Sequence, residues 1–272
     1  MSYPDKLFIY YIRGKVTKEF DLPDYIGCWR EAGDSFLFFS KPHDELIDEL
    51  VEKDKKLELK DRFEVDYFDW IGGKIDSFEV GGIKIIPIWE DVNTINQKDI
   101  VLDPGVVFGS GQHATTHNCL IAIDYVFSKD KDIKQVLDLG CGTGILSLFC
   151  ARLGAEKILS VDLNPLAVKA VKKNAILNKL ENKILPIWGS ALDFSPIKSH
   201  LLVANMHFDV ICQVTNLYNL NNFRWLILSG IFPHQLREIE NILFRKGVKI
   251  HRVLGQSSGW PTIIGGQKEW KN

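Results

Sequence analysis

The chain has 272 residues, which is enough for one large domain or two smaller ones. Its 46% hydrophobic and 25% charged residues are typical of a soluble globular protein, and no run of about twenty apolar residues could span a membrane. The net charge is −2, but residues 1–94 hold 21 Asp and Glu against 13 Lys and Arg. This acidic first third argues against direct binding of nucleic acid. Its charges either suit a basic protein partner or only solvate helix faces.

The five cysteines are odd in number, and no Cys or His pair has the spacing of metal ligands. We therefore expect free thiols in a cytoplasmic protein, since the first residues also lack the pattern of a secretory signal. His113 and His117 are four residues apart, but no third ligand is evident, so no metal site is predicted. A monomer is the default expectation.

The first third of the chain predicts a small α+β domain of ferredoxin-like type over residues 1–66. A short helix and turn, broken by Pro23, is expected over 19–33, between the first two strands. An amphipathic helix is expected over 43–52, because Leu46, Ile47 and Leu50 share one face. Apolar runs predict the three strands, at 7–12, 35–39 and 57–67.

Residues 67–94 are expected to form a linker with a hairpin. Gly72-Gly73 and Gly81-Gly82 mark turns, and residues 83–89 form an extended apolar run. Residues 95–272 would then form a second, larger domain.

The most informative stretch lies in this second domain and reads as strand, glycine loop, helix and strand. Val136 begins a short buried strand, and Gly140, Gly142 and Gly144 then allow a tight turn close to a ligand. A helix is predicted over 145–153, and the next strand, 158–161, ends at Asp162. In an open parallel sheet such a loop lies at the carboxyl edge, where the acid can accept both hydroxyls of a ribose.

Either a dinucleotide or S-adenosylmethionine could carry that ribose. The dinucleotide fingerprint GxGxxG needs a glycine where this chain has Ile145, and it places a pyrophosphate at the helix start. Asp138, two residues before the first glycine, is a poor neighbour for a pyrophosphate and a good one for an ammonium. The pattern therefore favours S-adenosylmethionine.

Alternating strands and helices continue to the end of the chain and predict an α/β fold, a doubly wound Rossmann-like sheet of seven strands. The helix after Asp162 is expected to bury Leu166, Val168, Val171, Ala175 and Ile176. A further helix is expected over 232–244. The remaining strands are expected at 184–188, 201–204, 225–228, 248–254 and 260–265.

Before the glycine loop, the segment LDPGVVFGSGQHATT places Thr115 and Thr116 at the start of a helix. Free backbone N–H groups and hydroxyls at a helix start can hold a carboxylate, which S-adenosylmethionine carries. One threonine could equally be a helix cap, and the two roles are compatible.

The strings DPGVVFGSGQHATT, LDLGCGTG, VDLNPLAV and VANM, in this order, resemble the ribosomal protein L11 methyltransferase family, PrmA. The resemblance covers residues 65–266. It implies a class I S-adenosylmethionine-dependent methyltransferase of protein lysine side chains, and of the α-amine as a further target, with a first domain that recognises the substrate.

Site residues are carried over position by position from this resemblance. Thr116, Gly140 and Asp162 match cofactor-binding positions. Asn205 matches the asparagine that contacts the cofactor near the methyl group, and it is the predicted catalytic residue, with His113 as a titrating helper. The other expected cofactor-site residues are Phe108, Gly109, Asp138, Gly142 and Gly144.

Three departures from the family pattern are visible. Ser110 replaces a usual threonine, Ser199-His200 replaces Phe-Asp, and the segment 219–225 (NLNNFRW) lacks the usual Pro-Gly-Gly turn. None of them touches the four matched cofactor positions, so they bear on substrate identity more than on chemistry.

Two other functions remain open. The first is methylation of a small molecule or a nucleic-acid base amine. Base-amine enzymes often carry Asn-Pro-Pro-aromatic where this chain has Asn205-Met206-His207-Phe208, which disfavours that alternative. The second is a non-catalytic module that only binds the cofactor.

Overall fold

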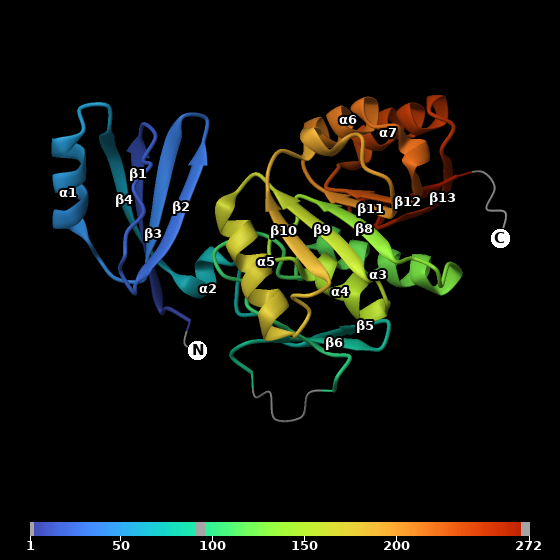
Figure 1. Ribbon diagram of the computed structural model, residues 1–272, viewed down its shortest axis with the longest axis horizontal. Coiled ribbons are helices and arrows are strands. Elements are labelled where there is room, and N and C mark those ends of the chain that lie inside the picture. Colours follow the sequence, from blue (N-terminus) through green and yellow to red (C-terminus); the bar gives the residue numbers. More distant parts are fainter. Residues whose placement is uncertain (1–2, 91–95, 268–272) are drawn as a thin grey trace. The chain divides into compact units, whose positions relative to one another are not determined.

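A computed structural model of the protein describes residues 3–90 and 96–267. Contacts divide the chain into two units (Figure 1). The first is Met1–Lys74 with Asn164–Leu166, and the second is Ile75–Leu163 with Ala167–Asn272. The domain boundaries expected after residues 66 and 94 stay predictions, and residues 91–95 lie outside the described part of the chain.

The first unit is built on a four-stranded antiparallel sheet, in the order β2-β3-β1-β4. This is the strand order of a ferredoxin-like sheet. Helix α1 packs on it through Ile47, and the short helix α2 follows the last strand. The elements are β1 (Lys6–Arg13), β2 (Tyr25–Glu31), β3 (Asp34–Phe39), α1 (Asp44–Lys53), β4 (Glu58–Asp66) and α2 (Tyr67–Trp70).

The helix expected between the first two strands is wrong, because residues 25–31 form strand β2 instead. Pro23 and the β-branched and aromatic side chains of this segment disfavour a helix. Ala32 and Gly33 both have positive φ, 52° and 94°, as in a two-residue hairpin turn that joins β2 to β3. The unit therefore keeps the ferredoxin-like sheet without its first helix.

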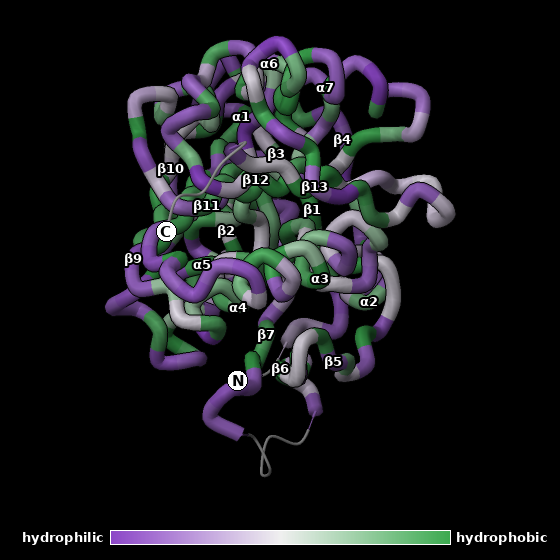
Figure 2. The backbone as a smooth tube through the Cα atoms, turned by 90° about the vertical axis from the view of Figure 1, so that its right-hand side faces the viewer, coloured by the Kyte–Doolittle hydropathy of each residue, from purple (hydrophilic) through white to green (hydrophobic). Residues whose placement is uncertain are grey.

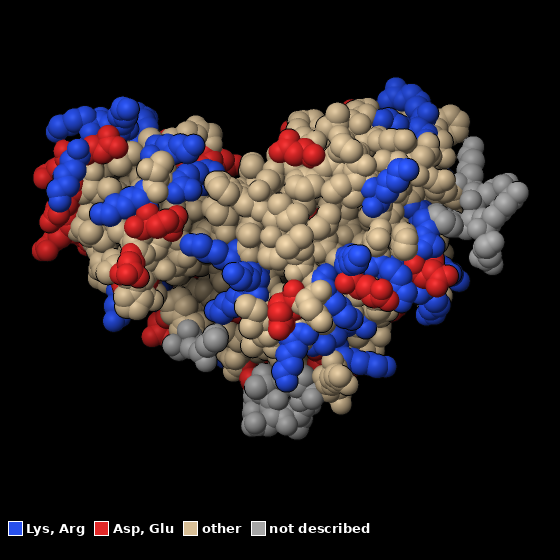
Figure 3. Space-filling model, in the orientation of Figure 1, with Lys and Arg blue, Asp and Glu red and all other residues tan. Residues whose placement is uncertain are grey.

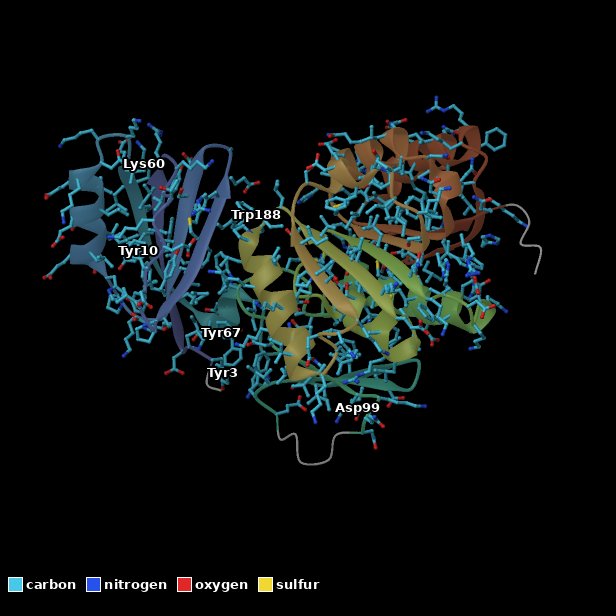
Figure 4. All side chains as sticks on the ribbon, viewed as in Figure 1. Tyr3, Tyr10, Lys60, Tyr67, Asp99 and Trp188 are labelled. Carbon is cyan, nitrogen blue, oxygen red and sulfur yellow. The ribbon has the colours of Figure 1, made fainter. Side chains whose placement is uncertain are left out.

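Helix α1 has an apolar face that packs on the sheet and an acidic face on its opposite side. Below it, Tyr10 lies in the core of the unit (Figure 4), and its hydroxyl accepts the N–H of His43 at 2.6 Å, just before the helix starts. Acidic side chains gather on the outer side of the helix (Figure 3). They are Asp44, Glu45, Asp48, Glu49 and Glu52, all of them exposed.

The second unit contains the predicted seven-stranded sheet, in the order β10-β9-β8-β11-β12-β14-β13. All neighbours are parallel except β14, which runs antiparallel to β12 and β13. The order reverses at β8, where the chain first enters the sheet. The strands are β8 (Gln135–Leu139), β9 (Lys157–Asp162), β10 (Ile184–Trp188), β11 (Ser199–Asn205), β12 (Phe223–Ser229), β13 (Lys249–Leu254) and β14 (Thr262–Gly266).

Helices cover both faces of this sheet (Figure 1). Successive residues of each strand point to opposite faces of the sheet and pack into two separate hydrophobic cores. Val136 and Val203 pack with α3, α4 and α5, whereas Leu137 and Leu202 pack with α6 and α7. In Figure 2, α6 and α7 show hydrophilic and hydrophobic positions along their turns, as amphipathic helices do. The helices are α3 (Ala114–Lys129), α4 (Ile145–Leu153), α5 (Pro165–Leu177), α6 (Phe208–Leu217) and α7 (Pro233–Arg245), with two short 3₁₀ turns, Ala191–Phe194 and Leu220–Asn222.

Two details of this unit differ from the sequence analysis. Helix α6 was not expected. The buried stripe of α5 is also partly wrong, because Ile176 is 55% exposed and Val168 is only partly buried. Asn174 and Asn178, which were not expected in the core, are buried instead.

The expected hairpin at Gly81-Gly82 is confirmed. Strands β5 (Phe78–Val80) and β6 (Ile83–Pro87) pair antiparallel, and β6 pairs in parallel with β7 (Ile100–Leu102). The segment Asp103-Pro104-Gly105, called the DPG segment, directly follows β7. The small sheet therefore fixes the position where the DPG segment starts. No helix in the described part of the chain is long and apolar enough to cross a membrane.

Candidate functional site

The residues singled out from the sequence come together at the carboxyl edge of the large sheet. The glycine loop follows β8, Asp162 ends β9 and Asn205 ends β11, on three adjacent strands. Because the strand order reverses at β8, this is the edge where open α/β sheets bind their ligands.

Backbone N–H groups of the glycine loop are already bonded within the protein. Gly140 and Cys141 donate to the carbonyl of Val161 at 2.9 and 3.2 Å, and Gly144 donates to Cys141 at 2.8 Å. The N–H of Gly142 donates to Asp162 Oδ2 at 3.0 Å. A pyrophosphate site needs such N–H groups directed at the ligand. The loop is therefore poorly suited to a dinucleotide and agrees with the choice of S-adenosylmethionine.

The loop also fits closely against its neighbours, with no space for side chains. A Cβ on Gly142 would lie 2.2 Å from the carbonyl oxygen of Phe108, and a Cβ on Gly140 would lie 2.5 Å from Met206 Cγ. The Phe108 carbonyl in turn accepts the N–H of Thr143 at 3.0 Å, and Thr143 Oγ1 donates to the Gly109 carbonyl at 2.6 Å. The FGSG segment (residues 108–111) and the glycine loop (residues 140–144) are thus packed and hydrogen-bonded against each other.

The first turn of α3 joins this structure to Asn205. His113 is the N-cap of α3, and its Nδ1 accepts the N–H of Thr115 at 3.3 Å and lies 2.8 Å from Thr115 Oγ1. Thr116, almost fully buried, accepts a hydrogen bond from Asn205 Nδ2 at 3.4 Å. That contact orients the carboxamide of Asn205. His113 therefore caps the helix through Nδ1, and its catalytic role stays a prediction.

Asp138 and Gly144, both expected near the cofactor, lie inside the fold. Gly144 precedes α4 and would meet Val171 of α5 if it carried a Cβ. Asp138 is 1% exposed, its Oδ2 accepts the hydroxyl of Ser147 at 2.6 Å, and its Oδ1 has no hydrogen-bond partner. Burial raises the pKa of Asp138 to about 7. Contact of either residue with the cofactor stays a prediction.

The raised pKa of Asp138 predicts a specific pH dependence of stability. Between its unfolded pKa of 3.8 and its folded pKa of about 7, only the folded chain holds the proton, so the free energy of unfolding falls as the pH rises. Above about pH 7 the penalty is complete. We expect the difference in unfolding free energy between the wild type and Asp138→Asn to change by about 3 kcal/mol between pH 5 and pH 8. Urea denaturation at both pH values measures it, and an equal difference at both would show that Asp138 does not titrate there.

Two buried asparagines, not recognised in the sequence, hold the site together. Asn174 Nδ2 donates to the carbonyls of Asp103 and Thr143, both at 2.9 Å, and its Oδ1 accepts the N–H of Asp103. Asn178 makes the same paired contact with the backbone of Val101. Asn174 thus ties the DPG segment to the glycine loop. The sequence offers one signal for Asn174, which is that it lies on α5 four residues, about one helical turn, before Asn178. Both asparagines are buried.

Two of the departures from the family pattern lie away from this site. Ser199 and His200 begin β11, at the end of the strand opposite to Asn205. They line a cavity of about 360 Å³ together with Asn221 and Asn222, which precede β12, and Arg224 at the start of β12. These departures therefore do not alter the cofactor edge.

Reactive side chains near the site are few. The thiol of Cys141 is buried, which raises its pKa well above the ordinary value, so it stays a neutral packed group. In residues 3–90 and 96–267, no three His, Cys, Asp or Glu side chains form a group that could hold a metal ion. His117 contacts the ring of Phe78, with 5.8 Å between ring centroids.

The strand order, the glycine loop and the acid after the second strand define the fold of the class I methyltransferases, which use S-adenosylmethionine. Within that class, a sequence model of the ribosomal protein L11 methyltransferase (PrmA) family matches residues 34–268. The chain belongs to this family.

Individual relatives agree with this assignment. The chain is 35% identical to a ribosomal protein L11 methyltransferase of Clostridium botulinum over 185 residues, and 34% identical to one of Acetivibrio thermocellus over 182 residues. These alignments cover 67% and 65% of this chain but only 58% and 56% of the relatives, less than two thirds of their length.

Solved structures show the same fold. The crystal structure of a ribosomal protein L11 methylase from Lactobacillus delbrueckii subsp. bulgaricus is 30% identical, with a TM-score of 0.58, and the match covers 69% of this chain and 95% of that one. Human methyltransferase 10 domain containing protein matches with a TM-score of 0.51 at 16% identity, over 62% of this chain and 88% of that one. At that identity the likeness concerns the fold alone.

Proposed function

We propose that this protein transfers methyl groups from S-adenosylmethionine to lysine side-chain amines of ribosomal protein L11, with its α-amine as a further target. The observation that carries the proposal is the contact of Asn205 with Thr116 beside the glycine loop, in a chain of the PrmA family. A ribosomal substrate also favours a cytoplasmic location.

The residues at the sheet edge fit S-adenosylmethionine. Gly140 and Gly142 let the loop pack against Met206 and Phe108 with no side chain between them, and we expect Asp162, at the end of β9, to accept ribose hydroxyls. The positive end of the α3 dipole suits a carboxylate. Below the loop, the unpartnered Oδ1 of Asp138 favours a cationic group nearby, which fits the ammonium of the amino-acid part.

When bound, S-adenosylmethionine supplies a methyl group that its sulfonium activates for direct transfer to an amine. The protein then needs mainly to position the amine and to exclude water. Asn205 Nδ2 is engaged by Thr116, so Oδ1 is the atom that can accept an N–H from the incoming amine. A lysine amine must arrive neutral, and transfer to a partly apolar site lowers its pKa. No strong base is required, and water can take the released proton.

Asn205→Ala tests the proposal. The full chain is incubated with labelled S-adenosylmethionine and purified ribosomal protein L11, and intact-protein and peptide masses are recorded. We expect mass gains in steps of one methyl on lysine for the wild type, and a rate about 100-fold lower for Asn205→Ala, because one positioned hydrogen-bonding group is lost. Cofactor affinity should change much less than the rate.

The matched control is Asn216→Ala, which removes an exposed asparagine of α6 whose Nδ2 bonds only to its own helix. It should methylate at the wild-type rate. A wild-type rate in Asn205→Ala would exclude the assigned role of this residue. Cofactor binding without any mass gain on the ribosomal protein would exclude that substrate and favour another amine.

Methylation of another protein, a small molecule or a nucleic-acid amine is the second candidate. The departures at Ser110, Ser199-His200 and the segment before β12 favour testing it, because they mark a divergent family member. The strand-end sequence Asn205-Met206-His207-Phe208 has no proline pair, which disfavours a flipped base as the target.

We further propose that residues 1–66 recognise the protein substrate. They form a unit with its own core, which includes Tyr10, Ile12, Leu37 and Ile47, so this part can act as a separate module. The acidic side chains on α1 suit a basic protein surface. We also propose that the protein acts as a monomer.

A further inference from the structure

Aromatic rings gather beside the candidate methyl-transfer site. The rings of Phe108 and His113 lie 5.4 Å apart, those of His113 and Trp260 4.8 Å, and those of Trp260 and Phe232 4.6 Å, measured between centroids. His234 stacks on Phe232 at 5.7 Å. Phe108 is 59% exposed and Phe232 45% exposed, although each contacts another ring. We call these five residues the aromatic cluster.

The strand register places this cluster next to Asn205. On β11 and β12, Asn205 is paired with Ser229, and Ser229 Oγ lies 2.7 Å from Thr262 Oγ1 on β14. Phe232 follows Ser229 by three residues, and Trp260 precedes Thr262 by two. On the other side of Asn205, His113 caps the helix whose Thr116 bonds to the Asn205 carboxamide.

Specific contacts hold the rings although they are exposed. Asn118 Nδ2 donates to the Trp260 carbonyl at 3.1 Å, which fixes the loop before β14. Gly230 has a φ of 87°, and a Cβ there would lie 2.1 Å from the Met206 carbonyl oxygen, so the loop that carries Phe232 runs directly beside the residue after Asn205. The rings are thus presented at the site and are not part of either core of the large sheet.

We propose that Phe108, Trp260 and Phe232 form the receiving surface for the lysine side chain, with ring faces against its methylene chain and its nitrogen. This inference rests on the proposed function. During transfer the nitrogen gains positive charge, and ring faces attract an alkylammonium. A carboxylate would do so too, but it would hold the amine in its protonated, unreactive form. The cluster has no acidic member, so it stabilises the developing charge and leaves the proton able to depart.

A consequence is that methylated lysine stays a good ligand. Each added methyl group increases contact with the rings, and a methylated ammonium is still attracted to their faces. The surface therefore favours repeated methylation of one lysine over release after the first methyl.

The first experiment measures binding to the full chain and needs no turnover. The probes are N-acetyl-trimethyllysine amide and its neutral tert-butyl isostere, titrated by NMR. We expect the wild type to bind the ammonium probe about fivefold more tightly than the isostere, and Phe232→Leu and Trp260→Leu to lose that preference. Phe244→Leu is the control, since this ring of α7 is 80% exposed and lies outside the cluster. It should keep the preference.

The second experiment counts methyl groups on ribosomal protein L11. Phe232→Leu and Trp260→Leu should raise the KM for the protein about tenfold and shift the products toward fewer methyls, with cofactor affinity unchanged. If the wild type prefers the ammonium probe through these rings but does not methylate the ribosomal protein, the surface stands and the substrate assignment fails. If the wild type methylates it, and the variants keep both the wild-type KM and the methyl count, the surface is wrong. Equal binding of both probes by the wild type also overturns it.

Discussion

Gly142→Ala is expected to weaken cofactor binding strongly. Gly142 has a φ of 52°, and a Cβ there would lie 2.2 Å from the carbonyl oxygen of Phe108. Because that oxygen also accepts the N–H of Thr143, the added methyl can be accommodated only if the glycine loop separates from the FGSG segment. Separation would displace the Gly142 N–H from Asp162. We expect affinity for S-adenosylmethionine, measured by calorimetry, to fall by about 100-fold or more, on top of a backbone strain of about 1 kcal/mol.

Gly247→Ala is the matched control for this substitution. Gly247 has a φ of 75°, and no atom lies within 4 Å of the position of its Cβ, so the variant has the backbone strain without the collision. Its affinity should equal that of the wild type, and its stability should fall by about 1 kcal/mol. Equal affinities in Gly142→Ala and the wild type would show that the close approach of the loop to Phe108 is not needed for binding.

The cofactor edge was predictable because its signals are local in the sequence. Glycines at fixed spacing and an acid at the end of a strand follow from backbone geometry over a few residues. The structure brings Gly140, Asp162, Thr116 and Asn205 to one edge of the sheet, in agreement with the order of the motifs. Which of them touch the cofactor stays a prediction.

The missed features depend on contacts that are distant in the sequence. Asn174 is polar and lies on a helix face where apolar residues were expected, and its partners, Asp103 and Thr143, are 71 and 31 residues away. The error at residues 25–31 has the same origin. Their pairing with β3 decides the strand, because four of the six paired β3 residues are aromatic or apolar. The local pattern of mixed charged and apolar residues, by contrast, resembles a short helix.

Burial and ring contacts also give some predicted residues surroundings that the sequence does not show. Asp138 was chosen for its charge, yet it lies under the glycine loop with a pKa raised to about 7, which spacing in the sequence cannot show. Phe108 and His113 were expected to shape the site, but their link through Trp260 to Phe232 joins segments more than 100 residues apart. The aromatic cluster was therefore visible only in the structure.

Removal of the first unit is expected to separate cofactor binding from methylation of the protein substrate. The residues expected at the cofactor site, from Phe108 to Asn205, all belong to the second unit, and its two cores are formed by residues from Val80 onward. A truncated chain of residues 75–272 should therefore bind S-adenosylmethionine with an affinity within about threefold of the full chain. Its kcat/KM for ribosomal protein L11 should fall by about 1000-fold, because binding energy from the recognition unit no longer positions the substrate.

The two measurements together decide what the first unit does. Circular dichroism and cofactor calorimetry on the truncated chain establish that the second unit is folded, so a loss of protein methylation cannot be attributed to unfolding. Full methylation of ribosomal protein L11 by residues 75–272 would exclude recognition by the first unit, and its acidic α1 would then serve only as a solvated helix face. Loss of methylation with retained cofactor affinity would instead place substrate selection in the first unit and methyl transfer in the second, because each property would follow a different part of the chain.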